Sequence, residues 1–150
     1  LDVHSIEQPI RAGQATEMAA LCRNTPVPIA LDEELIGIHH PAQKAALLEN
    51  IRPQYIILKP SLLGGLQAAQ EWAAAAMQVG AGWWATSALE SNVGLSAIAQ
   101  WAAAQGAGMP QGLGTGGLYT NNIPAPLQVK QGSLHYLPHG HWDLSPILKS

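Results

Sequence analysis

A strand–helix unit repeats along this chain and limits the folds that it can adopt. Short apolar runs end at Glu7, Asp32 and Lys59, and a stretch of helical composition follows each run. The run ends lie about 27 residues apart, and parallel strands need connections of a dozen or more residues, usually a helix. The sequence therefore predicts an α/β fold with a parallel sheet.

Two parallel architectures fit this repeat, an open doubly wound sheet and a (β/α) barrel. In barrels the functional side chains come from the carboxyl ends of several strands, and Glu7, Asp32 and Lys59 all stand at such ends. This placement favours a barrel. A complete barrel needs about 250 residues and eight strands. We therefore expect this chain, which has 150 residues and begins without methionine, to supply only the C-terminal half of one.

The repeat also predicts where the other elements lie. Helices are expected over residues 14–22, 41–50, 64–79 and 93–105, and further strands over 83–88 and 112–118. After Tyr119 the pattern changes to an extended segment with a small hairpin around Gly132. The predicted division is therefore a barrel part over residues 1–118 and an extended tail over 119–150 that packs on the barrel or on another domain.

Charge and cysteine content argue against several partners and locations. The formal net charge is -3, and no lysine or arginine cluster indicates binding to nucleic acid. The single cysteine, Cys22, cannot form an internal disulfide, so we expect a reducing cytoplasm and a buried helix position for this side chain. The uncharged run 72–89 is broken by Gly80 and Gly82, which predicts a helix, a turn and a strand there and no membrane span.

Charged side chains at the ends of buried strands are unfavourable unless they pair or bind something. Glu7 and Asp32 offer the oxygen ligands that magnesium prefers, and Lys59 beside such a metal can act as acid, base or cationic stabiliser. The prolines that follow Gln8 and Lys59 should hold both residues in extended conformations. The alternative is a structural ion-pair cluster, because ion-pair networks also occur away from functional sites.

Two further patterns carry less weight. The glycine-rich segment 112–117 matches a dinucleotide-binding motif, but no helix follows it and no acidic residue lies about 20 positions on. We expect its glycines to let a loop approach the substrate closely, with Gly114 and Thr115 as binding candidates. The histidines at 39–40, 139 and 141 lack a further metal ligand in the sequence nearby, so exposed positions are expected for them.

Four segments together resemble the enolase superfamily and, within it, the family of o-succinylbenzoate synthases. They are IEQP at 6–9, LDEEL at 31–35, LKPSLLGG at 58–65 and TSALESNVG at 86–94. Their order and spacing match, and so does the tail segment YTNNIP at 119–124. The third and fourth segments discriminate best, because Glu-Gln-Pro and Asp-Glu occur across the superfamily.

The resemblance implies a modified (β/α)7β barrel preceded by a capping domain, of which this chain would hold the last five strands. Glu7 and Asp32 then match the second and third of three carboxylate ligands of magnesium, for which manganese can substitute, and Lys59 matches a catalytic lysine. The first metal-binding aspartate and a Lys-x-Lys motif would lie upstream. The missing half of the barrel and the capping domain are therefore expected partners.

The resemblance also implies an activity. It places substrate contacts after the fourth strand, at Ser87, Glu90 and Ser91, although core and helix-capping roles suit these residues equally. The implied enzyme is a lyase that dehydrates 2-succinyl-6-hydroxy-2,4-cyclohexadiene-1-carboxylate in menaquinone or phylloquinone synthesis. The alternatives are an N-acylamino acid racemase, a dipeptide epimerase or a muconate cycloisomerase with the same metal and lysine, and a non-catalytic partial barrel.

Overall fold

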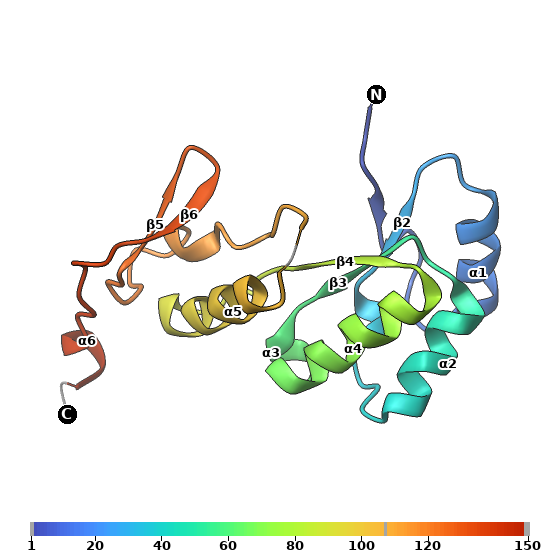
Figure 1. Ribbon diagram of the computed structural model, residues 1–150, viewed down its shortest axis with the longest axis horizontal. Coiled ribbons are helices and arrows are strands. Elements are labelled where there is room, and N and C mark those ends of the chain that lie inside the picture. The colour runs from blue at the N-terminus through green and yellow to red at the C-terminus, as the bar shows by residue number, and fades with distance from the viewer. Residues whose placement is uncertain (1, 107, 149–150) are drawn as a thin grey trace. The chain divides into compact units, whose positions relative to one another are not determined.

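The chain folds into two compact units in a computed structural model that describes residues 2–106 and 108–148. The first unit is Leu1–Ala85 and the second is Thr86–Ser150 (Figure 1). The predicted boundary after residue 118 separates the barrel part from the tail in the complete protein, and it stays a prediction. The sheet whose strand ends carry Glu7, Asp32 and Lys59 lies entirely in the first unit.

The first unit contains a four-stranded parallel sheet, which confirms the predicted fold class. Its spatial order follows the chain, β1 (Ile6–Glu7), β2 (Ile29–Leu31), β3 (Tyr55–Leu58) and β4 (Gly82–Ala85). The fourth strand ends three residues before the predicted Ala88. Ile56 and Leu58 project from one face and are fully buried, as expected for strands covered by helices.

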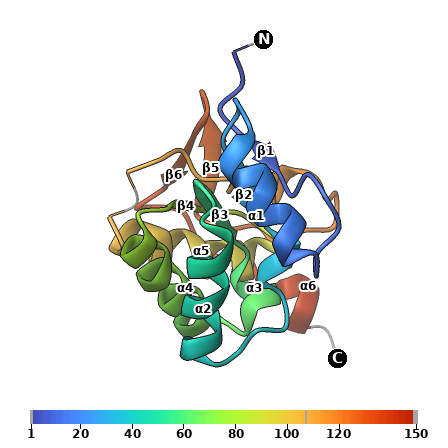
Figure 2. The same cartoon turned by 90° about the vertical axis from the view of Figure 1, so that its right-hand side faces the viewer.

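Four helices and a short turn connect these strands. They are α1 (Ala15–Asn24), the 3₁₀ turn Glu33–Leu35, α2 (Pro41–Ile51), α3 (Pro60–Leu63) and α4 (Leu66–Val79). Figures 1 and 2 show α1, α2 and α4 on the same side of the sheet, where α2 packs against both α1 and α4. Fully buried side chains such as Met18, Leu48 and Trp72 form the core of this layer.

The helix predicted over 64–79 is interrupted at its start. Gly64 and Gly65 have φ angles of +99° and +106°, which end α3 before α4 begins at Leu66. The uncharged run 72–89 is split as predicted, because α4 ends at Val79 and β4 begins at Gly82. In the described residues, no helix has both the length and the apolar character needed to cross a membrane.

The face of the sheet opposite these helices carries an aromatic cluster. Tyr55 and Trp84 project from it and are half-buried, and their ring centroids lie 5.7 Å apart. The His4 ring packs on both, with centroid distances of 4.7 Å to Tyr55 and 5.9 Å to Trp84. This face therefore has an aromatic layer, whereas α1, α2 and α4 lie on the other face.

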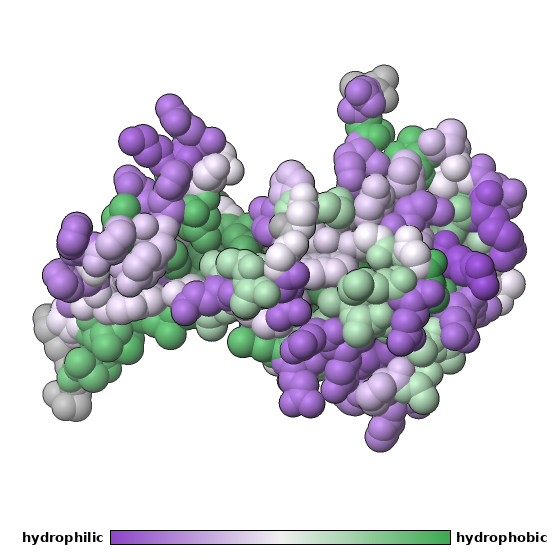
Figure 3. All heavy atoms as spheres, viewed as in Figure 1, coloured by the Kyte–Doolittle hydropathy of each residue, from purple (hydrophilic) through white to green (hydrophobic). Residues whose placement is uncertain are grey.

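The second unit is built around α5 (Asn92–Ala104) and an antiparallel hairpin. The hairpin pairs β5 (Leu127–Lys130) with β6 (Ser133–Tyr136), which confirms the prediction around Gly132. Gln131 and Gly132 both have positive φ, at +50° and +75°, as a two-residue hairpin turn requires. A last helix, α6 (Ser145–Leu148), was not expected from the sequence, and exposed apolar side chains gather over it (Figure 3).

The strand predicted over 112–118 is wrong except at its first residue. Gly112 forms one parallel bridge with Thr86, and Thr115–Gly117 then forms a 3₁₀ turn. A Cβ atom added at Gly112 would lie 2.4 Å from Thr86 Oγ1, so only glycine fits this approach. Further glycines disfavour a continuing strand, because they offer no side chain to pack on a sheet.

Candidate functional site

The three charged residues predicted at strand ends lie together at the carboxyl edge of the sheet. Glu7 is the last residue of β1, Asp32 follows β2, and Lys59 follows β3. The register pairs Glu7 with Ala30 and Ala30 with Tyr55, so the alternation of side chains places all three on one face. The adjacency of the three strands thus brings together residues distant in sequence.

A lysine ammonium joins the two carboxylates. Lys59 Nζ donates a hydrogen bond to Asp32 Oδ2 and lies 3.7 Å from Glu7 Oε1. The Asp32 side chain is only 3% exposed, whereas 21% of Lys59 and 56% of Glu7 remain accessible. The site therefore has a buried carboxylate at its base and an accessible carboxylate at its rim.

Local structure orients these side chains. Lys59 is the N-cap residue of α3, and Pro60 occupies the first helical position, where a missing N–H is tolerated. Asp32 is in the same way the N-cap of the 3₁₀ turn. The expectation of an extended Gln8 is wrong, because its φ is +36°. Its side chain makes several hydrogen bonds that hold this unusual backbone conformation.

Negative charge exceeds positive charge in the site. Burial lowers the pKa of Lys59, but the hydrogen bond to Asp32 and the charges of Asp32 and Glu7 outweigh it, and the net shift is upward. Burial raises the pKa of Glu7, and a hydrogen bond to Asp32 and the charge of Asp32 raise it further, against the opposing effect of Lys59. One ammonium thus faces two adjacent carboxylates and does not neutralise them.

This donor set fits a hard divalent cation. Carboxylate oxygens are the ligands that magnesium prefers, and magnesium usually takes only a few of them together with water and substrate oxygens. Both carboxyl groups lie against the same ammonium of Lys59, which brings them together at one edge of the sheet. Among the residues that the structure describes, no group of three or more His, Cys, Asp or Glu can hold a metal. Glu7 and Asp32 could therefore supply at most part of a coordination shell.

Two polar residues beside this site were not singled out from the sequence. Gln8 and Glu34 are hydrogen-bonded to one another, and Glu34 is 6% exposed although its neighbour Glu33 lies at the surface. The available signal was three consecutive acidic residues at 32–34 in a chain with few charges, but it did not tell which of them turn inward.

The predicted substrate-binding residues after β4 lie in the second unit. Ser87 is 6% exposed, its Oγ donates to Glu90 Oε2 at 2.6 Å, and it accepts a hydrogen bond from the Leu89 N–H at 2.9 Å. Ser91 is exposed and occupies the N-cap position of α5, where its side chain makes no capping hydrogen bond. The structure therefore joins Ser87 to Glu90 and leaves Ser91 outside that contact.

The glycine-rich loop holds the other two predicted contacts. Gly114 is exposed, and Thr115 begins the 3₁₀ turn with its hydroxyl oxygen buried and without a hydrogen-bond partner. An unpaired buried hydroxyl is unfavourable and suits a position that meets a polar group of a ligand. Binding by Gly114 and Thr115 stays a prediction.

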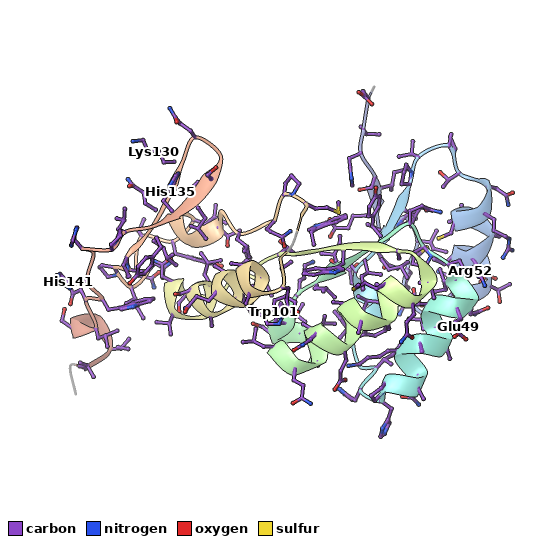
Figure 4. The ribbon with its side chains drawn as sticks, in the orientation of Figure 1. Glu49, Arg52, Trp101, Lys130, His135 and His141 are labelled. Atoms are coloured by element: carbon purple, nitrogen blue, oxygen red, sulfur yellow. The ribbon has the colours of Figure 1, made fainter. Side chains whose placement is uncertain are left out.

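Cys22 and the histidines outside the site have the burial that was predicted for them. Cys22 is 5% exposed in α1, and burial raises the pKa of its thiol. His39, His40, His139 and His141 are all exposed. Figure 4 shows His141 in the segment after the hairpin and His135 on β6.

The sequence matches a family model and curated proteins over most of its length. The model of the enolase C-terminal domain-like family matches residues 1–140. The chain is 63% identical over 132 residues to o-succinylbenzoate synthase from Desulfotalea psychrophila, which covers 88% of this chain and 36% of that protein. It is 33% identical over 134 residues to o-succinylbenzoate synthase from Mycobacterium tuberculosis, with 86% and 37% covered.

The fold of this chain also matches that of a solved structure. The crystal structure of MenC from Desulfotalea psychrophila superimposes with a TM-score of 0.84 at 63% sequence identity and covers 88% of this chain. The match covers 37% of that chain. The present chain thus spans little more than a third of the length of the relatives that it matches.

Proposed function

We propose that this chain, which belongs to the enolase C-terminal domain-like family, forms the C-terminal part of the barrel of an o-succinylbenzoate synthase. The identity of 63% to an o-succinylbenzoate synthase supports this function more strongly than a fold match alone. The observation that carries the chemistry is the contact of Lys59 with both Asp32 and Glu7 at the carboxyl edge of the sheet.

The rest of the barrel would come from residues outside this chain. Parallel sheets are usually covered on both faces. The helices α1, α2 and α4 lie on one face, and Tyr55 and Trp84 are half-buried on the other. Strands that continue the sheet beyond β1 would close it, so that this face becomes the barrel interior. A capping domain would complete the protein, whose cytoplasmic location stays a prediction.

The proposed reaction is the loss of water from 2-succinyl-6-hydroxy-2,4-cyclohexadiene-1-carboxylate to give o-succinylbenzoate. A base removes the proton from the carbon next to the carboxylate, and the hydroxyl group then leaves as the ring becomes aromatic. The difficulty is the negative charge that builds up on the carboxylate during proton removal. Magnesium or manganese held by Glu7 and Asp32 would supply positive charge there.

Lys59 has a different task from the base. Its ammonium is fixed by Asp32 and Glu7 and would stabilise the developing negative charge from the side of the ring that it faces. The base would be a lysine of the Lys-x-Lys motif that the family resemblance places upstream. Ser87, Glu90, Ser91, Gly114 and Thr115 would contact the small carboxylate substrate.

Turnover of the cyclohexadiene by the full-length protein tests this proposal. We expect o-succinylbenzoate to form in the presence of magnesium, to stop when the metal is chelated, and to fall about 100- to 1,000-fold in the Lys59→Ala variant. Lys130 is exposed on β5 (Figure 4), so Lys130→Ala is a control that should keep turnover. Racemisation of an N-succinylamino acid without dehydration would assign the chain to a racemase instead, and absence of both activities would favour a non-catalytic partial barrel.

A further inference from the structure

The side chain of Gln8 connects the ends of β1 and β2 beside the two carboxylates. Its Oε1 accepts hydrogen bonds from the backbone N–H groups of Asp32, at 3.0 Å, and Glu34, at 3.3 Å. Its Nε2 donates to the Ile10 carbonyl at 3.0 Å and to Glu34 Oε2 at 3.2 Å. The two donors and two acceptors around it fix which end of the amide is oxygen.

Glu34 anchors this network from the other side. It is 6% exposed, and its second oxygen accepts a hydrogen bond from the Gly13 N–H at 3.0 Å. A buried carboxylate needs such partners, because an unpaired one is strongly unfavourable. The amide of Gln8 and the carboxylate of Glu34 therefore tie the segment after β1 to the turn after β2.

We propose that Gln8 is a positioning residue, which holds Glu7 and Asp32 at the separation that a divalent cation requires. The inference rests on the proposed function, because it presumes that these carboxylates bind metal. Gln8 is covalently next to Glu7, its own N–H donates to Ala30 O at 2.9 Å, and its side chain binds the Asp32 N–H. One residue thus fixes the backbone of both ligands.

The chemistry of magnesium makes such positioning consequential. Magnesium demands a nearly ideal octahedron with ligands at about 2.0–2.1 Å, so small displacements of one carboxylate weaken binding. Groups that orient metal ligands typically change metal affinity by about 10- to 100-fold when they are replaced. A methionine at position 8 keeps the length of the side chain but removes all four hydrogen bonds.

The same sheet offers a matched control at its other end. Gln54, just before β3, accepts a hydrogen bond from the Ile29 N–H at 2.9 Å and donates to the Cys22 carbonyl at 3.0 Å. Like Gln8 it is a half-buried amide that links β2 to a neighbouring segment. It contacts neither carboxylate of the candidate site through a hydrogen bond that the structure describes. Gln54→Met should therefore reduce stability without changing the metal site.

The test is the affinity of the full-length protein for Mn²⁺ alone, measured from the free-ion signal in electron paramagnetic resonance. We expect Gln8→Met to bind Mn²⁺ about 10- to 100-fold more weakly than the wild type, and Gln54→Met to bind it as tightly as the wild type. Thermal melts of both variants record the loss of stability separately. Equal affinity in Gln8→Met and wild type, or an equal loss in both variants, would overturn the positioning role.

Two further variants keep the test decisive. Asp32→Asn removes a proposed ligand, so wild-type affinity in that variant would show that the proposed metal site is wrong, apart from any role of Gln8. If Gln8→Met does not fold, Glu34→Gln takes its place, because it puts a donor where Gln8 Nε2 now finds an acceptor. Weakened Mn²⁺ binding in Glu34→Gln would support the inference, and unchanged binding would overturn it.

Discussion

Two lysines of the first unit pair with carboxylates, and the two pairs differ in whether negative charge remains unbalanced. Lys44 on α2 is fully buried and forms a 2.7 Å ion pair with Glu71 on α4. It also donates to the Ala68 carbonyl at 3.2 Å and lies 5.6 Å from the centroid of the Trp72 ring. Here one positive charge meets one negative charge within a helix layer, and the pair is complete.

Lys59 presents the opposite arrangement. Its buried partner is the carboxylate of Asp32, a second carboxylate from Glu7 lies within reach, and the group opens to solvent at Glu7. The charges do not balance, so negative charge is in excess at this edge of the sheet. An ion pair alone therefore does not mark a functional site. An excess of one charge at an accessible strand end is the more informative sign.

The largest difference between the two lysines should appear in catalysis. In the full-length protein, Lys59→Met should lower kcat for dehydration by about 100- to 1,000-fold, since it removes a cation aimed at developing charge. Lys44→Met should leave kcat close to that of the wild type, because Lys44 lies between helices. Steady-state kinetics of both variants test this prediction. A comparable loss of kcat in both would contradict the different roles of Lys59 and Lys44.

Without metal, the two substitutions should also differ in stability. Lys59→Met leaves the buried carboxylate of Asp32 without its counter-ion and should reduce the free energy of unfolding by about 3 kcal/mol. Lys44→Met replaces a desolvated cation by an apolar side chain of similar length and should change it by no more than about 1 kcal/mol. Denaturant titrations with a chelator present measure both values, and the reverse order would contradict our description of the two pairs.

Added metal should stabilise the protein through the sheet edge that carries Asp32 and not through the pair of Lys44 with Glu71. Magnesium at about 100 times its dissociation constant should raise the free energy of unfolding by about 2.7 kcal/mol in the wild type and in Glu71→Gln. Asp32→Asn should lose this dependence. Thermal melts over a series of magnesium concentrations test the prediction, and stabilisation that persists in Asp32→Asn would place the ion elsewhere.

The smallest expected effect is the pH dependence of the balanced pair. The hydrogen bond from Lys44 lowers the pKa of Glu71. Burial opposes this shift, and the charge of Lys44 and a hydrogen bond with Gln67 add to it, so the net shift is downward. The ionised form is therefore favoured by folding, so its contribution to stability is present above the unfolded-state pKa and is lost as the pH falls through the lower folded-state pKa. The difference in unfolding free energy between wild type and Glu71→Gln should stay constant down to about pH 5 and shrink below it. A difference that grows in acid would have the wrong sign.

Sequence patterns predicted those parts of the molecule that depend on local order. The apolar runs with charged ends predicted the strands and the convergence of Glu7, Asp32 and Lys59, because parallel strands bring their carboxyl ends to one edge. The hairpin was predictable in the same way, since Gly132 supplies the positive φ of its turn. In these cases the determining contacts lie within a strand–helix unit or a turn.

Features that depend on distant contacts were missed. The positive φ of Gln8 contradicts the local preference of a residue before proline, and it is compensated by hydrogen bonds to residues about 25 positions away. The strand expected over 112–118 failed because a single bridge to Thr86 decides how far pairing extends. Neither contact leaves a periodic pattern in the sequence.

The network around Gln8 has a consequence for the motions of the strand ends. The backbone N–H groups of Asp32 and Glu34 both point at Oε1 of that one side chain, although they belong to a turn and not to the sheet. Exchange of these two N–H groups with deuterium from solvent therefore requires that their hydrogen bonds to the Gln8 side chain break. The exchange rates of these two N–H groups therefore report how often this edge of the sheet opens.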